Sequence, residues 1–358
     1  EDKTSTADWD YNDVNVSVAW NGQLQVDESD FSLNASRDFS GVFTVQPGAD
    51  GQRSLTYELT LAAANPDTGR LDSGLVDSLS GQPVYLSLTP AGVVEGRTSG
   101  GELVFSVSVN AAGVVVLDQS RAIIHPTSDP DEPKSLLADV LGLRATVTDN
   151  DGDAASTSLD LGQLISFKDD GPLAIDDAAA TLIEGGAITV ASGNVLNNDL
   201  AGADGGKAFV NWNTSANGTA MSELAKYGAL VLDPATGQYS FTLNNNDPDT
   251  LGLSEGQIVS QRLQYTMRDA DGDISTAFVT FTITGSDNGV TLGNLNVEGG
   301  EVRVDEQHLA NGSAPDSAAL TQTGSFSIEA ADGIQSISIG GSPAFSFAQL
   351  QAASVDAP

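Results

Sequence analysis

The sequence predicts an all-β protein made of β-sandwich domains arranged in series. Three observations lead to this fold class. Apolar residues alternate with polar residues over many short runs, which is the pattern of half-buried strands. Turn-forming residues separate these runs at frequent intervals, as they do in sandwich folds. The chain also holds 38 glycines and is rich in Thr, Ser, Val, Asp and Asn, a composition that favours strands and turns over helices.

Length and charge limit the classes of function. With 358 residues, of which 40% are hydrophobic, the chain can form two or three domains with real cores. Its 14 basic and 49 acidic residues give a net charge of −35. Nucleic acids and anionic membranes repel such a chain, so we expect neither as a partner. The acidity is consistent with two explanations, solubility or dependence on bound cations.

The absence of cysteine excludes disulfides, thiolate metal sites and cysteine-based catalysis. An extracellular protein without disulfides needs another means of stabilisation, for which calcium is a candidate. No apolar run reaches the roughly 18 residues of a membrane span, so we expect no membrane insertion in this segment. No signal peptide is visible and the chain begins at Glu1, so we interpret it as a slice of a longer protein.

Changes of pattern along the chain predict four segments. The first is interpreted as the end of a preceding domain, and two complete units follow it. The last is interpreted as the truncated start of a further repeat, because Val304-Asp305-Glu306 echoes Val26-Asp27-Glu28. The predicted segments are 1–25, 26–172, 173–287 and 288–358.

Within the two units, local signals predict individual elements. The run 103–109 turns at Asn110–Gly113 into a second apolar run, a hairpin signature with glycine in the connection. Residues 228–243 predict another hairpin around an Asp-Pro…Gly turn. Residues 220–227 are the best helix candidate. Further alternating runs predict strands at 55–61 and 84–88.

The most informative feature is an acidic run that occurs twice. Residues 149–153 read Asp-Asn-Asp-Gly-Asp and residues 269–273 read Asp-Ala-Asp-Gly-Asp. Alternating apolar runs enter and leave both, so each is predicted to be the turn of a β-hairpin. Three carboxylates in one turn repel each other by about 4 kcal/mol per pair at 4 Å and an effective dielectric of 20. The predicted metal ligands in these turns are Asp149, Asp151, Asp153, Asp269, Asp271 and Asp273.

Calcium is the cation that fits these turns best, since it takes six to eight oxygen ligands in a flexible geometry. Gly152 and Gly272 allow the backbone to fold around an ion. The site is not an EF-hand, because Ala154 and Asp160 stand where that loop needs Gly and Glu. The alternative interpretation is a solvated polar turn, against which the recurrence of the run with its flanks argues.

Two further acidic pairs flank the predicted boundary between the units. Asp169-Asp170 and Asp176-Asp177 are separated by Gly171-Pro172. Proline fixes its own φ and restricts the residue before it, so both pairs can be held near one place. We predict Asp169, Asp170, Asp176 and Asp177 as calcium ligands at a junction, with a polar linker as the alternative. Glu184, Asp199 and Asp204 are weaker candidates.

The sequence contains few residues in an arrangement that catalysis needs, and we expect no enzymatic activity. A Ser-His-Asp triad would need His125 or His308, and no nucleophile-elbow motif occurs. No acid/base pair stands at a recognisable spacing. With only two histidines, the chain has too few ligands for a histidine-based zinc site.

Several of these residues carry a resemblance to a known family. Residues 83–172 resemble the later part of the 143-residue repeat of giant type I-secreted adhesins of Gram-negative bacteria, the RTX adhesins. Residues 173–287 resemble the VCBS-type or cadherin-like repeat of the same proteins. The landmarks of the first are Gly101-Glu102-Leu103-Val104-Phe105, the run 122–132 (Ala-Ile-Ile-His-Pro-Thr-Ser-Asp-Pro-Asp-Glu), the run 148–153 and Asp169-Asp170-Gly171-Pro172. Those of the second are the run 193–199 (Gly-Asn-Val-Leu-Asn-Asn-Asp), the turn 233–239 and the run 265–273.

The resemblance implies tandem Ig-like or cadherin-like β-sandwiches that extend from a cell surface, with Ca²⁺ stiffening the modules and their junctions. It implies an extracellular protein exported by type I secretion, with a role in cell adhesion and biofilm. Its expected partners are calcium ions, neighbouring repeats of the same chain, and a host or environmental glycan or protein bound through other domains. The glycine-rich nonapeptide of RTX proteins and a C-terminal secretion signal are absent here and are expected outside this slice. The alternative is that one unit is itself a glycan- or peptide-binding module.

Overall fold

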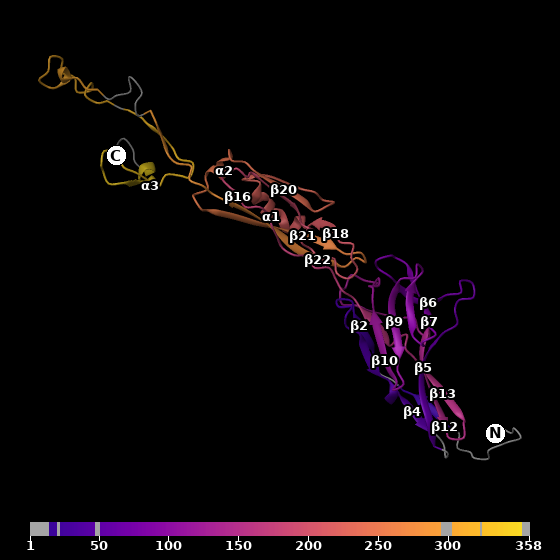
Figure 1. Cartoon of the computed structure of the whole chain (residues 1–358). Helices are drawn as coiled ribbons and strands as arrows, with labels where there is room; N and C mark the ends of the chain where they lie inside the picture. Colours follow the sequence, from indigo (N-terminus) through magenta and orange to yellow (C-terminus); the bar gives the residue numbers. More distant parts are fainter. Residues whose placement is uncertain (1–13, 20–21, 47–50, 295–302, 323, 353–358) are drawn as a thin grey trace.

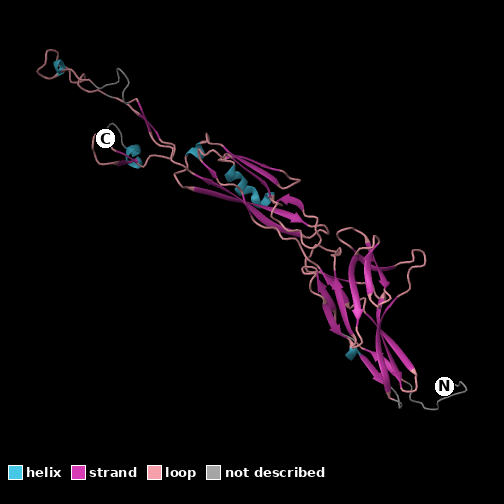
Figure 2. Ribbon diagram, viewed as in Figure 1, coloured by secondary structure: helices cyan, strands magenta, loops and turns pink. Residues whose placement is uncertain are grey.

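The computed structural model describes residues 14–19, 22–46, 51–294, 303–322 and 324–352. Figure 1 shows two β-rich units placed end to end, followed by a third segment with little regular structure. Strands dominate both units, and the few helices are short (Figure 2). The predicted fold class, serial β-sandwich domains, is therefore confirmed.

The first unit contains fourteen strands and one short 3₁₀ helix. Its central sheet has six strands in the order β3-β10-β9-β8-β7-β6, and smaller sheets β11-β14-β2, β13-β12-β5 and β1-β4 complete the unit. The elements are β1 (Asn15–Val18), β2 (Leu24–Asp27), β3 (Ala35–Asp38), η1 (Ser40–Val42), β4 (Phe43–Gln46), β5 (Gln52–Leu61), β6 (Leu71–Val76), β7 (Pro83–Leu88), β8 (Val94–Thr98), β9 (Leu103–Val109), β10 (Val114–Gln119), β11 (Pro133–Ser135), β12 (Leu141–Asp149), β13 (Ala154–Asp160) and β14 (Ile165–Lys168).

Alternation of side chains explains the core of this unit. Along β12 every second residue is buried, and the same holds along β10, so both strands direct one face inward. Phe105 and Phe167 meet in this core with ring centroids 5.0 Å apart. The hairpin predicted at Asn110–Gly113 is the β9–β10 turn.

The N-terminal strands belong to this unit. β1 pairs with β4, β2 pairs in parallel with β14, and Val14, Val16 and Leu24 pack in the first core. We predicted that residues 1–25 end a preceding domain. The described part of that range, 14–19 and 22–25, instead belongs to the first unit. Residues 1–13 lie outside the described residues. Local sequence did not reveal this, because β2 meets its partner β14 far along the chain.

The second unit has two sheets and two helices. One sheet has the order β15-β22-β21-β18 with β16 also paired to β22, and the other has the order β17-β20-β19. The elements are β15 (Asp177–Ala178), β16 (Leu182–Ile183), β17 (Val190–Asn194), β18 (Ala208–Trp212), α1 (Thr214–Leu224), β19 (Gly228–Leu232), β20 (Gln238–Leu243), α2 (Pro248–Leu251), β21 (Ile258–Arg268) and β22 (Ile274–Thr284).

A separate core fills the second unit. Tyr265, Phe241 and Phe281 are fully buried there, and the rings of Phe241 and Phe281 meet edge to face. The predicted hairpin 228–243 is β19–β20. The predicted helix at 220–227 exists but begins six residues earlier, at Thr214, because Asn217 bonds the backbone of β21 and anchors this stretch.

The third segment holds only short pairs of strands among its described residues. These elements are β23 (Thr291–Gly293), η2 (Glu306–His308), β24 (Ser327–Glu329), β25 (Ser336–Ile337), β26 (Phe345–Ser346) and α3 (Phe347–Ala352). Across the described parts of the chain, no helix has the length and apolar character needed to span a membrane.

Candidate metal centre

The two acidic runs form the same turn. In the first, the Oδ1 atom of Asp149 accepts hydrogen bonds from the N–H groups of Gly152 and Asp153 at 3.0 and 2.8 Å. In the second, Oδ1 of Asp269 accepts from Gly272 and Asp273 at 3.1 and 2.8 Å. These turns close the β12–β13 and β21–β22 hairpins, as predicted.

A glycine makes each turn possible. Gly152 and Gly272 have φ values of 109° and 119°, which residues with a side chain rarely adopt. The backbone can then fold back so that all three carboxylates face one region. In each turn one carboxylate oxygen per residue lies within 4.8 Å of the others, as a shared cation requires.

The environments of the two turns differ. In the first turn Asp151 and Asp153 are exposed, and this turn lies at the end of the first unit farther from the second (Figure 1). In the second turn Asp273 is 0% exposed and Asp269 is 3% exposed. The second turn is buried because it faces the first unit.

The linker between the units is fixed by contacts from both sides. Oδ2 of Asp170 accepts a hydrogen bond of 2.8 Å from the N–H of Ala203 in the second unit. Gly202 lies so close to the linker that a Cβ there would stand 2.9 Å from the carbonyl oxygen of Gly171. From the first unit, the carbonyl oxygen of Glu132 accepts a hydrogen bond of 3.0 Å from the N–H of Asp169. The units also touch directly, since the N–H of His125 donates to Oδ2 of Asp271 at 3.3 Å. The two units therefore meet at a defined interface.

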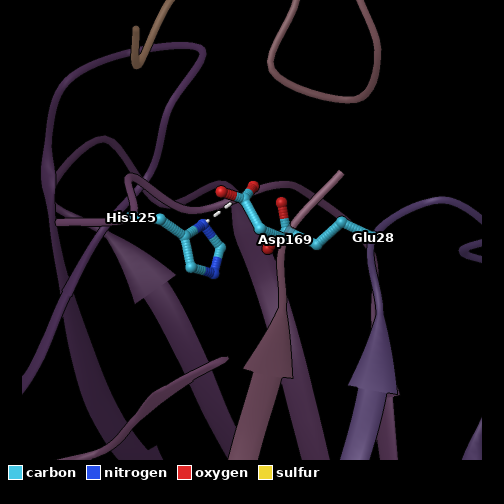
Figure 3. Close-up of side chains that lie close together, drawn as sticks. All are labelled: Glu28, His125 and Asp169. Carbon is cyan, nitrogen blue, oxygen red and sulfur yellow. Dashed lines mark ion pairs between the residues drawn. The ribbon is translucent and has the colours of Figure 1, made fainter. Parts of the chain in front are cut away.

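Three ionisable side chains meet on the first-unit side of this interface (Figure 3). Nδ1 of His125 lies 3.1 Å from Oδ1 of Asp169, and all atoms of both side chains are buried. Glu28 lies beside them and is 2% exposed. Its Oε1 atom accepts hydrogen bonds from the side chain of Gln119 at 2.6 Å and from the N–H of Ile123 at 3.1 Å.

Both ring nitrogens of His125 face oxygen atoms. Nε2 lies 3.2 Å from the carbonyl oxygen of Phe167, while Nδ1 faces Asp169. Burial alone would lower the pKa of His125, but the bond to Asp169 and the charge of Glu28 outweigh it and raise the pKa to about 9. The raised pKa favours the imidazolium form of His125 beside the Asp169 carboxylate.

The acidic residues of the junction form a continuous chain of clusters. Asp169 belongs to the cluster with His125 and also to one with Asp204 and Asp271. Asp271 in turn belongs to the second acidic turn. The members of this junction cluster are Glu28, His125, Asp169, Asp204, Asp269, Asp271 and Asp273.

The junction cluster fits a hard cation. Eight of its buried carboxylate oxygens lack a hydrogen-bond donor: Oε2 of Glu28, Oδ2 of Asp169, both of Asp204, Oδ2 of Asp269, Oδ1 of Asp271 and both of Asp273. Buried polar atoms in native proteins normally have partners, and unpaired buried carboxylates are costly. Oxygen atoms of this kind are the ligands that Ca²⁺ takes.

The pKa values of the junction carboxyl groups reflect their burial without hydrogen-bond donors. Burial, together with neighbouring carboxylates, raises the pKa of Asp204, Asp269 and Asp273 to about 7 each. Burial also raises the pKa of Glu28 to about 8. In contrast, the hydrogen bond with Asp151 and the turn N–H groups hold the pKa of Asp149 below its ordinary value.

The predicted ligands do not all lie in these clusters. Asp170 fastens the linker instead, through its bond to Ala203. Asp176 pairs with Arg262 at 2.7 Å and accepts a bond from the N–H of Phe278. Asp177 lies beside Asp199 within the second unit. The restriction imposed by Pro172 therefore did not bring the pairs 169–170 and 176–177 together.

Three residues of the junction cluster were not among the predicted ligands. Glu28 was visible only as part of the motif that opens the first unit, and Asp204 was a weak candidate. His125 lay within a landmark of the resemblance, yet nothing local linked it to a carboxylate. Each of these three contacts residues more than 40 positions away in the sequence.

Known families cover most of the two units. Residues 23–162 match a family described as a domain of unknown function (DUF5801). Residues 169–282 match the family described as the bacterial Ig domain. The second unit is therefore similar to a bacterial Ig-like domain. Its match begins at Asp169, so the acidic linker falls within it.

Individual relatives are more distant. A calcium-binding lectin, RapA2 of Rhizobium johnstonii, is 32% identical over 124 residues, a match that covers 32% of this chain and 48% of the relative. This chain thus spans about half of that protein's length. Among solved structures, three cadherin domains of mouse protocadherin PcdhgC3 are 17% identical, with 78% of this chain and 70% of that chain covered and a TM-score of 0.24. The human desmocollin-1 ectodomain is 12% identical, with 80% and 45% covered and a TM-score of 0.22.

Proposed function

We propose that this chain is a structural segment of a bacterial surface adhesin, in which Ca²⁺ stiffens serial β-sandwiches and their junction. The single observation that carries the proposal is the junction cluster. Its buried, unpaired carboxylates come from both units, so one or more shared cations would bind the units to each other. The matches to a bacterial Ig domain and to a calcium-binding lectin support this type of protein.

The ligands would be divided between the units. Glu28 and Asp169 would contribute oxygens from the first unit and linker, and Asp204, Asp271 and Asp273 from the second. The cation would neutralise carboxylates that otherwise repel across the interface. Calcium at 100 times its dissociation constant adds about 2.7 kcal/mol per independent site of the folded state. The outer turn, 149–153, would hold a further ion at the far end of the first unit.

The remaining expectations belong to the same proposal. The segment acts as an extender without enzymatic activity, it is extracellular, and it leaves the cell by type I secretion. Its role is to project a distal binding domain for adhesion or biofilm formation. The VCBS-type and RTX character of the repeats is part of the proposal as well.

Limited proteolysis tests the proposal directly. Leu173 follows the linker and is 54% exposed, so cleavage there reports on how firmly the junction is held. We expect Ca²⁺ to slow cleavage between residues 169 and 174 by at least tenfold relative to EGTA, with fragments identified by mass spectrometry.

Asp271→Asn should remove this protection, because Asp271 is shared by two clusters. Asp151→Asn, the matched change in the outer turn, should keep it. Equal cleavage rates of the wild-type chain in Ca²⁺ and in EGTA would contradict the proposal.

The name of the lectin relative favours one alternative, a unit that itself binds a glycan or peptide. In the first unit, a groove of about 200 Å³ is lined by Arg70, Tyr85 and Arg97 among others. The guanidinium of Arg70 lies 4.9 Å from the ring centroid of Tyr85. Arg97 also pairs with Glu95 at 2.7 Å, so Arg70 beside the ring of Tyr85 is the group that best suits an acidic sugar. Binding to an acidic glycan on an array, lost in Tyr85→Ala and Arg97→Ala, would support this alternative, and an array without signal would exclude it.

A further inference from the structure

A second group of unpaired carboxylates lies inside the second unit. Asp177 begins β15 and is paired in register with Val279 of β22, five residues beyond the end of the acidic turn at Ile274. At about 3.3 Å per residue this places Asp177 roughly 16 Å along the strand from that turn. Asp177 and Asp199 both lie next to the hydroxyl of Tyr265. This group is therefore distinct from the junction cluster.

Asp199 is held firmly and is almost completely enclosed. It is 3% exposed, and its Oδ1 atom accepts hydrogen bonds from the N–H of Ile175 at 2.7 Å and from the Tyr265 hydroxyl at 2.8 Å. Its Oδ2 atom is buried without a donor. Oδ2 of Asp177 is likewise buried without a donor. Two carboxylates thus each present a buried, unpaired oxygen in one region.

More oxygens surround the Tyr265 hydroxyl than its hydrogen can serve. The carbonyl oxygens of Ile175 and Val195 lie 3.1 and 3.3 Å from this hydroxyl, in addition to Oδ1 of Asp199. A phenol has one hydrogen to donate. Lys207 bonds the carbonyl oxygens of Leu196 and Asp199 with its Nζ atom, and not the two carboxylates. The side chain of Asn198 donates to the carbonyl oxygens of Ile175 and Asp176 at 3.0 and 3.3 Å. The acceptors left for a cation are therefore the Oδ2 atoms of Asp177 and Asp199, with the carbonyl oxygen of Val195 nearby.

We propose that Asp177 and Asp199, assisted by the backbone carbonyl oxygen of Val195, bind a divalent oxygen-seeking cation, Ca²⁺, inside the second unit. This ion would fasten the segment that leaves the linker onto the loop before β18 and onto β21. The inference deepens the proposed function but has its own ligands, so each can fail without the other. The competing explanation is a proton shared by the two carboxylates, which would need no metal.

Terbium luminescence tests the site, since Tb³⁺ replaces Ca²⁺ and emits when an adjacent tyrosine is excited. The Tyr265 hydroxyl touches the proposed site, so the wild-type chain should show tyrosine-sensitised emission that Ca²⁺ competes away. Asp199→Asn should remove most of this emission, and Asp271→Asn at the junction should leave it in place. Emission that is unchanged in Asp199→Asn would overturn the proposal.

Native mass spectrometry in Ca²⁺ provides the second measurement. Asp177→Asn is the milder variant, because this side chain is only partly buried and its loss leaves the bonds of Asp199 to Ile175 and Tyr265 intact. We expect both variants to bind one calcium fewer than the wild-type chain while retaining the ions lost in Asp271→Asn. Circular dichroism confirms that each variant is folded. An unchanged calcium count in folded Asp177→Asn would show that the carboxylates share a proton instead.

Discussion

At the scale of single residues, His125 distinguishes the junction from an ordinary calcium turn. Its ring is buried against Asp169, and Glu28 lies on the other side of that pair. Calcium ligands are oxygens, so we assign the imidazolium the role of an internal positive charge rather than of a ligand. This charge stabilises the carboxylates when calcium is scarce and opposes the ion when calcium is present.

The substitution His125→Gln follows from this role. Removing one member of a buried ion pair leaves an uncompensated charge, so we expect a loss of about 3 to 5 kcal/mol of stability in EGTA. The same change removes a positive charge from beside the metal site, so the rise in melting temperature on adding Ca²⁺ should be larger than in the wild-type chain. Differential scanning calorimetry in EGTA and in Ca²⁺ measures both. A smaller calcium-dependent rise would indicate that His125 is itself a ligand.

At the scale of elements, the two acidic hairpins show how one local sequence acts in two settings. The turns share their glycine conformation and their hydrogen bonds, because both follow from the Asp-x-Asp-Gly-Asp run itself. Only the turn of β21–β22 is enclosed, since the first unit covers it. The pKa values of its end residues, Asp269 and Asp273, are raised to about 7 for this reason.

The raised pKa values predict how stability depends on pH without calcium. The folded chain retains protons on Asp204, Asp269, Asp273 and Glu28 at pH values where the unfolded chain has lost them, so stability falls as pH rises. His125 acts in the same direction, since the stability from its raised pKa is lost as pH rises toward about 9. In EGTA at constant ionic strength, the melting temperature should fall between about pH 5.5 and about pH 8.

Saturating Ca²⁺ should reduce or reverse this fall, because the ion needs deprotonated carboxylates. The calcium-dependent gain in melting temperature should therefore be larger at about pH 8 than at about pH 5.5. A melting temperature in EGTA that rises over the same range would mean that the junction carboxylates are not enclosed in the calcium-free chain.

These elements also show what sequence alone could predict. Turns, hairpins and their acidic ligands depend on neighbouring residues, so the runs 149–153 and 269–273 were predictable. Glu28 reaches His125 and Asp169 only through the parallel pairing of β2 with β14, which no local pattern reveals. The structure places Asp176 outside the junction cluster, where Arg262 lies across the sheet and pairs with it. The residues that the sequence analysis missed all make contacts with segments far away along the chain.

At the scale of the whole molecule, the two units have separate cores joined by a polar, acidic interface. Because the two cores are separate clusters among the described residues, we expect the units to lose structure independently. Their relative placement rests instead on the linker bonds and the junction cluster. We therefore expect calcium to change the connection between the units more than the fold of either.

A core substitution tests this independence. Phe281 is 1% exposed and packs against Phe241 and Tyr239 in the second unit. Phe281→Ala should cost about 3 to 5 kcal/mol in the second unit. Tryptophan fluorescence from Trp212, which is buried in the same core, should report an earlier transition. The transition of the first unit, followed by hydrogen exchange along β10 and β12, should remain in place. A matching loss of protection in the first unit would show that the two units unfold together.

Small-angle X-ray scattering in millimolar Ca²⁺ and in EGTA tests the central claim most directly. If shared cations hold the two units in line, the calcium-loaded chain should scatter as one extended body with a sharply defined maximum dimension. The chelated chain should give a broader distribution of distances, and Asp271→Asn should resemble it even in Ca²⁺. Superimposable profiles of the wild-type chain in the two conditions would contradict the account.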